Sequence, residues 1–235
     1  MMSKKKIEED FLGYLIPLIE KEGFLLVKKQ LTGSEHLVVF EKQEGNVRYV
    51  WSLYFLKYGR VDVFFKVYFN ETTLLLKNSD THKVFDSEIF LVDLRTYTNP
   101  ANKGDYSSEG SLYETPHSND LMNGINIEDA AKGVFMAFFK MPIPKLTERL
   151  GSLEKADKLL NNEPTVEFNN KDFNVLIYSA TGVSQLLSSL LVAKATNNPS
   201  LPILGRIYMD FINTINPDGR PDIVALKEII PSLIV

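Results

Sequence analysis

The sequence predicts an α+β protein: an N-terminal helix packed on an antiparallel sheet of about five or six strands, followed by a helical C-terminal half. Three observations support this fold class. An amphipathic segment opens the chain, aromatic and β-branched residues dominate 47–76, and the apolar period changes from two to helical after residue 125. A helix followed by such a meander buries its apolar stripe on one face of the sheet.

The opening helix is expected at 4–22, because apolar residues recur there at helical spacing. Pro17 lies inside this range and is expected to kink or split the helix. Gly23 suits a left-handed C-terminal cap. The apolar stripe consists of Ile7, Phe11, Tyr14, Leu15, Leu18 and Ile19.

A run of strands is expected next, since alternating or β-rich segments are separated by short polar turns such as 32–34 and 44–46. The predicted strands are 24–30, 36–41, 47–57, 60–70, 72–77 and 84–94. From 97 to 123 the pattern gives way to Asn, Ser, Gly and Pro, which predicts a long loop that is either functional or disordered.

Helices are expected after this loop. Asn126 is a good N-cap for the first, and the others are predicted near 145–161, 183–196, 202–215 and 223–230. The boundary near residue 125 separates a helix-plus-sheet part, 1–125, from a helical part, 126–235. The two parts are either separate domains or one packed unit.

The central hairpin suggests a candidate binding surface. If residues 58 and 59 form a two-residue loop, Val50, Ser52 and Tyr54 share a face with the odd-numbered residues of the second strand, beneath the first helix. The other face is then aromatic but interrupted by charge, and Trp51 lies opposite Lys66. A one-residue slip exchanges the faces of one strand. The candidate binding residues on the aromatic face are Tyr49, Trp51, Phe64, Lys66 and Tyr68.

Two interpretations of this aromatic face compete. The C-terminal helices cover it, or it forms a surface for a ligand or a protein partner, for which Tyr and Trp offer a large area at low entropic cost. If the helices cover this face, its aromatic residues belong to the core. If they do not, these residues are free to contact a ligand or partner.

Composition excludes several kinds of site. A net charge of −4 disfavours broad nucleic-acid binding, and the absence of Cys excludes disulfides, thiolate catalysis and Cys-based zinc sites. No apolar stretch reaches the length of a membrane span, and no secretory leader pattern is visible, so a cytoplasmic protein is expected. No cofactor is expected, no residue is assigned as a metal ligand, and the oligomeric state is open.

Catalytic motifs are incomplete. In 174–191 an apolar run is followed by a small-residue turn and an expected helix. A nucleophile elbow needs two glycines (G-x-S-x-G) and a dinucleotide fingerprint needs three (G-x-G-x-x-G). This segment has only Gly182, so it matches neither motif. The segment then reads as a core helix capped by Thr181. The densest polar cluster is Asp80, His82, Asp86, Glu88 and Asp93, which could do acid–base work or hold a metal.

The chain resembles a group of small uncharacterised bacterial domains of unknown function. The resemblance rests on the PLIEKEGF helix end, the hairpin-rich sheet and the segment FFKMPIPKLTERLGSLEKADKLL, and it covers about residues 7–162. Some members of that group are suspected immunity-type proteins encoded near toxin systems. The resemblance implies a binding protein and no catalytic residue.

These observations favour a non-enzymatic binding or interaction protein that uses the aromatic sheet face. Its ligand is unknown, and a protein is one candidate partner. The alternative is an enzyme of unrecognised type with a carboxylate-rich site around Asp80–Asp93. A structural subunit of a larger assembly would use the same aromatic face.

Overall fold

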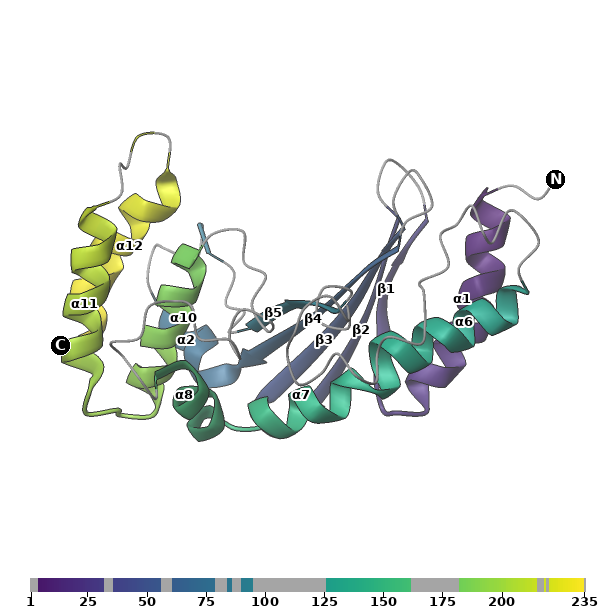
Figure 1. Ribbon diagram of the computed structural model, residues 1–235, viewed down its shortest axis with the longest axis horizontal. Helices are drawn as coiled ribbons and strands as arrows, with labels where there is room; N and C mark the ends of the chain where they lie inside the picture. The colour runs from purple at the N-terminus through teal and green to yellow at the C-terminus, as the bar shows by residue number, and fades with distance from the viewer. Residues whose placement is uncertain are drawn as a thin grey trace. The chain divides into compact units, whose positions relative to one another are not determined.

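The computed structural model describes residues 4–31, 36–55, 61–78, 84–85, 90–94, 126–161, 182–214, 218 and 220–234. It confirms the predicted α+β class, with an N-terminal helix, an antiparallel sheet and C-terminal helices (Figure 1). The predicted loop at 97–123 and the turn at 32–34 lie outside the described residues, as does Thr181.

The chain divides into two compact units whose segments alternate along the sequence. Unit 1 comprises 1–43, 49–65 and 92–147, and unit 2 comprises 44–48, 66–91 and 148–235. Residues 126–147, which were predicted to belong to the helical half, therefore lie in the same unit as the N-terminal helix.

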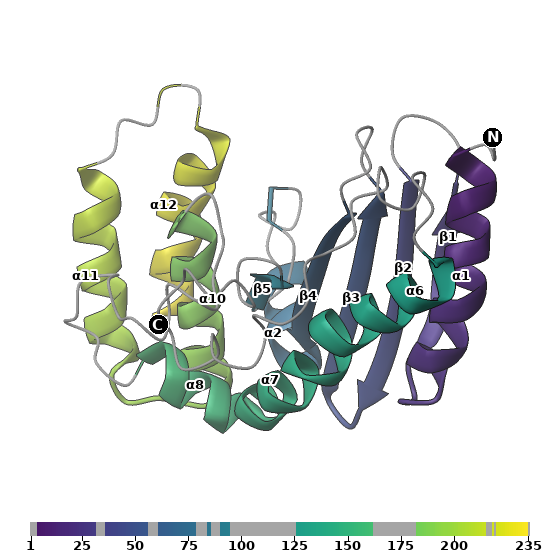
Figure 2. The ribbon, with the colours of Figure 1, turned by 45° about the vertical axis from the view of Figure 1, so that its right-hand side comes forward.

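The strands follow one another in the sheet in chain order (Figure 2). Four of them form an antiparallel meander, in which Gly45 takes a positive φ of 57° at the turn between the second and third, and a short fifth strand adjoins the fourth. The strands are β1 (Leu25–Gln30), β2 (His36–Glu44), β3 (Val47–Phe55), β4 (Val61–Phe69) and β5 (Phe90–Asp93).

One predicted strand is wrong. Residues 72–77 belong to a helix, α2 (Asn70–Lys77), and not to the sheet. Leu, Glu and Lys favour helices, and the two buried residues, Thr72 and Leu76, are four apart as in a helix. The Thr72 hydroxyl also donates to the carbonyl oxygen of Phe69 at 3.0 Å, which fixes the step from β4 into the helix.

Helix α1 (Lys4–Glu20) contains Pro17 and is not split there, in contrast to one of the two expectations. Its C-terminal end is followed by a left-handed glycine, as predicted. Gly23 has a φ of 85°, and its N–H donates to the carbonyl oxygen of Glu20. Tyr14, assigned to the apolar stripe, is instead 46% exposed, and Leu12 is buried in its place. The buried apolar residues of α1 are Ile7, Phe11, Leu12, Leu15 and Ile19.

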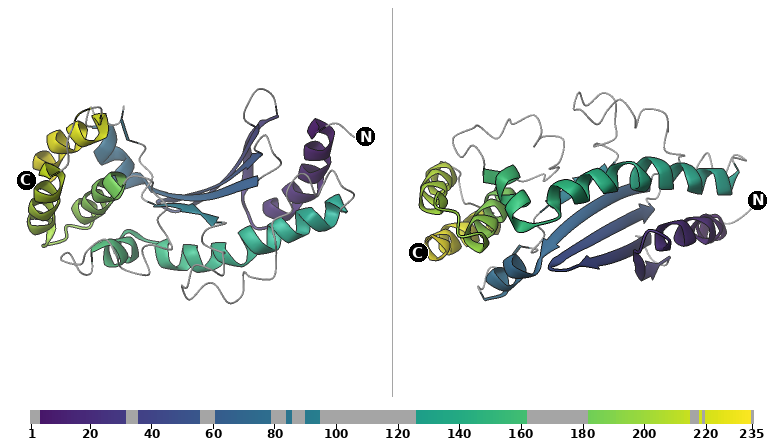
Figure 3. Two further views of the ribbon diagram at one scale, coloured as in Figure 1. Left: turned by 45° about the horizontal axis from the view of Figure 1, so that its top comes forward. Right: turned by 90° about the horizontal axis from the view of Figure 1, so that it is seen from below.

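Helix α6 (Ile127–Phe135) packs against α1 and leads into the π-helix η2 (Met136–Lys140), and both lie along one side of the sheet (Figure 3). The predicted N-cap is confirmed, since the Asn126 side chain accepts hydrogen bonds from the backbone N–H groups of Glu128 and Asp129. Helix α7 (Pro142–Leu150) follows.

Unit 2 contains a cluster of helices around α10 (Gly182–Ala195), whose described side chains at 186–193 are all buried. The Asp157 carboxylate connects α8 to the segment before α11, because it accepts hydrogen bonds from the side-chain amides of Asn161 at 2.7 Å and Asn198 at 2.8 Å. Burial raises the pKa of Tyr208, which is hydrogen-bonded to Ser189. The surrounding helices are α2, α8 (Leu153–Asn161), α11 (Leu201–Asn213) and α12 (Pro221–Leu233).

The first turn of α12 carries a pH-dependent ion pair. The Arg220 guanidinium donates to both carboxylate oxygens of Asp222, at 3.0 and 2.7 Å, and these hydrogen bonds lower the pKa of Asp222. Because the folded state binds this proton more weakly than the unfolded chain, the stabilisation exists above the unfolded pKa and is lost as the pH falls.

Asp222→Asn is therefore expected to lower the free energy of unfolding by about 0.5–1 kcal/mol near neutral pH, as for a partly exposed pair. The difference from the natural protein should shrink below about pH 4. Urea unfolding at neutral and acidic pH measures both values. If the variant and the natural protein differed in free energy of unfolding by the same amount at neutral and at acidic pH, the role given to this ion pair would be contradicted.

Candidate functional site

The hairpin register differs by one residue from the prediction. The Tyr49 and Phe65 rings stack, with centroids 5.9 Å apart and planes at 11°, so these two residues share a face. Tyr54 and Phe64 meet edge to face at 5.5 Å on the opposite face. Odd-numbered residues of β3 thus lie with odd-numbered residues of β4. A two-residue loop at 58 and 59 would place odd-numbered residues of β3 with even-numbered residues of β4, so this register contradicts it.

We call the side that α1 and η2 cover the inner face of the sheet. Phe11 of α1 meets Phe55 edge to face at 5.9 Å, and Phe139 of η2 meets Trp51 at 5.7 Å. The indole N–H of Trp51 donates to the carbonyl oxygen of Phe138, 3.0 Å away. Buried residues of unit 1 on this face are Val38, Phe40, Tyr49, Trp51, Leu53, Phe55, Val61, Val63 and Phe65.

The five predicted binding residues therefore do not share one surface. Tyr49 and Trp51 belong to the core, with exposures of 1% and 0%. Phe64, Lys66 and Tyr68 occupy the alternate positions of β4, on the other face. The prediction of a common face is wrong because the faces were assigned correctly for β4 but were exchanged for β3.

The outer face of unit 1 carries a half-buried aromatic pair, Tyr54 and Phe64. Leu37 and Val39 of β2 lie on this face as well, because Phe40 contacts Trp51 on the inner one, and both are half-buried. Asp62, two positions before Phe64 on β4, is also half-buried. Val50 and Ser52 share the outer face but are buried.

Lys66 and Tyr68 belong to the part of β4 that lies in unit 2. The Arg48 guanidinium lies over the Tyr68 ring, 4.1 Å from its centroid, as in a cation–π contact. The predicted pairing of Trp51 with Lys66 is wrong, since these side chains lie on opposite faces.

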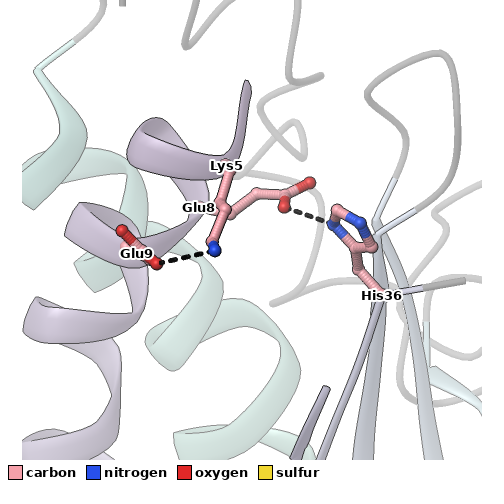
Figure 4. Close-up of polar contacts among 4 residues, drawn as sticks. All are labelled: Lys5, Glu8, Glu9 and His36. Carbon is pink, nitrogen blue, oxygen red and sulfur yellow. Dashed lines mark hydrogen bonds and ion pairs between the residues drawn. The ribbon is translucent and has the colours of Figure 1, made fainter. Parts of the chain in front are cut away.

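A buried carboxylate–histidine pair connects α1 to the start of β2 (Figure 4). Nδ1 of His36 lies 2.5 Å from Oε2 of Glu8, and the two side chains are 15% and 2% exposed. Glu8 lies among the apolar residues of α1, where a charged group is costly unless it is paired. Lys5 and Glu9 form an ion pair on the exposed side of the same helix, with Nζ of Lys5 4.0 Å from Oε1 of Glu9.

This arrangement fixes the histidine ring. A carboxylate oxygen accepts a hydrogen bond from a ring nitrogen that carries a proton, so Nδ1–H of His36 donates to Glu8. The sequence interpretation passed over the pair, because its two residues are far apart in the chain. The available signal was Glu8 itself, a carboxylate three residues before Phe11 on the buried stripe.

A groove of about 610 Å³ lies between α1 and the start of α6. Two of its three acids are paired with lysines one turn away: Lys6 Nζ lies 2.7 Å from Asp10, and Lys132 Nζ lies 2.7 Å from Glu128. Hydrogen bonds to these acids raise the pKa of both lysines. The groove is therefore close to charge-balanced and offers no unpaired acid among these residues for catalysis.

Most of the predicted carboxylate cluster lies outside the described residues. This applies to Asp80, His82, Asp86 and Glu88, and to the side chain of Asp93. Within the described ranges, no group of three or more His, Asp or Glu side chains is placed to hold a metal ion. Within the same ranges, no helix combines the length and the apolar character that crossing a bilayer requires.

Comparison with known proteins finds no matching family model, no matching curated protein and no matching solved structure. The resemblance to immunity-type domains therefore rests on residue pattern alone.

Proposed function

We propose that the protein is a non-enzymatic binding protein that holds a protein partner on the outer face of its sheet in unit 1. The observation that carries this proposal is the half-buried Tyr54–Phe64 pair, on the face opposite to α1 and η2. The predicted cytoplasmic location is part of the same proposal.

Physical chemistry supports this choice of surface. Aromatic side chains dominate binding energies because they bury a large area with few rotatable bonds. The edge-to-face contact between Tyr54 and Phe64 holds both rings in place before a partner arrives, so little entropy is lost on binding. Leu37 and Val39 extend the apolar area on β2.

The charge on this face favours a protein over an apolar small molecule. Asp62 is half-buried on the strand that carries Phe64. An aromatic centre next to charged groups is typical of protein–protein interfaces, in which polar groups surround the buried centre.

Site-specific crosslinking tests the proposal. A photoreactive phenylalanine analogue in place of Tyr54 is expected to capture a protein in cells that produce the chain naturally. The same analogue in place of Tyr14, which is 46% exposed on α1, is the matched control. Both replacements start from a surface tyrosine of unit 1.

Capture of one protein from position 54 and not from position 14 would support a partner on the outer face. Equal capture from the two positions, or none from position 54, would overturn it.

A further inference from the structure

Helix α11 carries an apolar stripe of exposed and half-buried residues. It packs on α10 and α12 through residues such as Leu204, Tyr208 and Ile212, which are buried. Ile203 is 53% exposed and Phe211 is 43% exposed, and Ile207 between them is half-buried. These three residues are four apart, so they form one continuous stripe along the helix.

Two opposite charges lie along one edge of this stripe. Arg206 and Asp210 are both exposed, and they too are four residues apart. Among the residues that the structure describes, neither takes part in an ion pair. Both are therefore available to a partner.

We propose that this stripe is where a second copy of the chain docks, with the two α11 helices antiparallel about a two-fold axis at Ile207. The stripe is symmetric about that residue, so Ile203 meets Phe211 of the partner subunit and Ile207 meets Ile207 of the partner subunit. A two-fold interface requires such a self-complementary patch.

The charges fit the same symmetry. In an antiparallel helix pair, each edge of the stripe faces the same edge of the other helix. Arg206 is then within reach of Asp210 of the partner subunit, and the axis repeats this contact, which gives two ion pairs. In a parallel pair this edge would face the opposite edge of the other helix, so the two ion pairs would not form.

The dimer is expected to be weak. The helix has 13 residues, which gives a length of about 20 Å at about 1.5 Å per residue. An interface of one helix from each copy is smaller than the standard total of about 1,600 Å². The proposal concerns unit 2 and stands apart from the binding function assigned to the outer face.

Sedimentation equilibrium of the full chain tests the proposal, at concentrations from about 1 μM to 1 mM around the affinity range of small interfaces. A monomer–dimer equilibrium is expected. Arg206→Asp and Asp210→Arg should each raise the dissociation constant about tenfold or more, because each places like charges together twice. The double variant with both changes should return to the natural value. Glu228→Arg, a reversal at an exposed residue of α12, is the matched control and should leave the constant unchanged.

All three positions are exposed, so circular dichroism should show folded proteins. A chain that stays monomeric over the whole range overturns the proposal. So does a dimer that the single reversals do not weaken, or one that the double reversal does not restore, since another surface would then be responsible.

Discussion

Trp51→Ala is expected to lower the free energy of unfolding by about 3–5 kcal/mol, as truncation of a buried aromatic residue does. Trp51 is fully buried, its ring contacts Phe40 and Phe139, and its N–H is hydrogen-bonded to the carbonyl of Phe138. Urea unfolding measures the loss. Tyr54→Ala on the outer face is the comparison and should cost no more than about 1–2 kcal/mol, because that side chain is only partly buried.

The fluorescence of the natural protein gives an independent check, since Trp51 is the only tryptophan in the chain. A buried indole is protected from a water-soluble quencher until the protein unfolds. Full quenching in the folded state, or a loss on Trp51→Ala no larger than that on Tyr54→Ala, would mean that Trp51 lies on the open side of the sheet.

Loss of one partner of the Glu8–His36 pair is the second large effect expected. Glu8 is 1% exposed, and removing one member of a buried pair removes the hydrogen bond that offsets the cost of burying the other. His36→Ala is therefore expected to cost about 3–5 kcal/mol. Urea unfolding near neutral pH measures this cost.

Joint replacement separates pairing from simple packing. The double variant Glu8→Leu with His36→Leu removes both polar groups and keeps apolar volume, so it should be markedly more stable than His36→Ala and close to the natural protein. If the loss in the double variant equalled the sum of the losses from Glu8→Leu and His36→Leu made singly, the contact at 2.5 Å would contribute little to stability.

The sequence predicts the elements of this fold better than their partners across the sheet. Strong local patterns located α1, the first four strands and the caps at Gly23 and Asn126. The strand register failed because it depends on loop length, and alternation in β3 alone is uninformative: Val50 and Ser52 are buried on one face and Tyr49 and Trp51 on the other.

Tertiary contacts explain the remaining differences. Residues 72–77 have the composition of either a strand or a helix, and the spacing of Thr72 and Leu76 in α2 buries both on one side. Glu8 and His36 meet only when α1 packs on the sheet, so no spacing in the sequence predicts their contact. Of the predicted site, Phe64 remains on the face that we assign to binding.

The affinity of Phe64→Ala for the protein captured from position 54 tests the proposed surface most directly. Phe64 contacts Tyr54 and is half-buried, so truncation should leave the fold intact, as circular dichroism would show. Binding should weaken by about 2 kcal/mol or more, which is about thirtyfold, as expected for a central aromatic residue. Unchanged affinity in a folded Phe64→Ala protein would contradict a partner on the outer face.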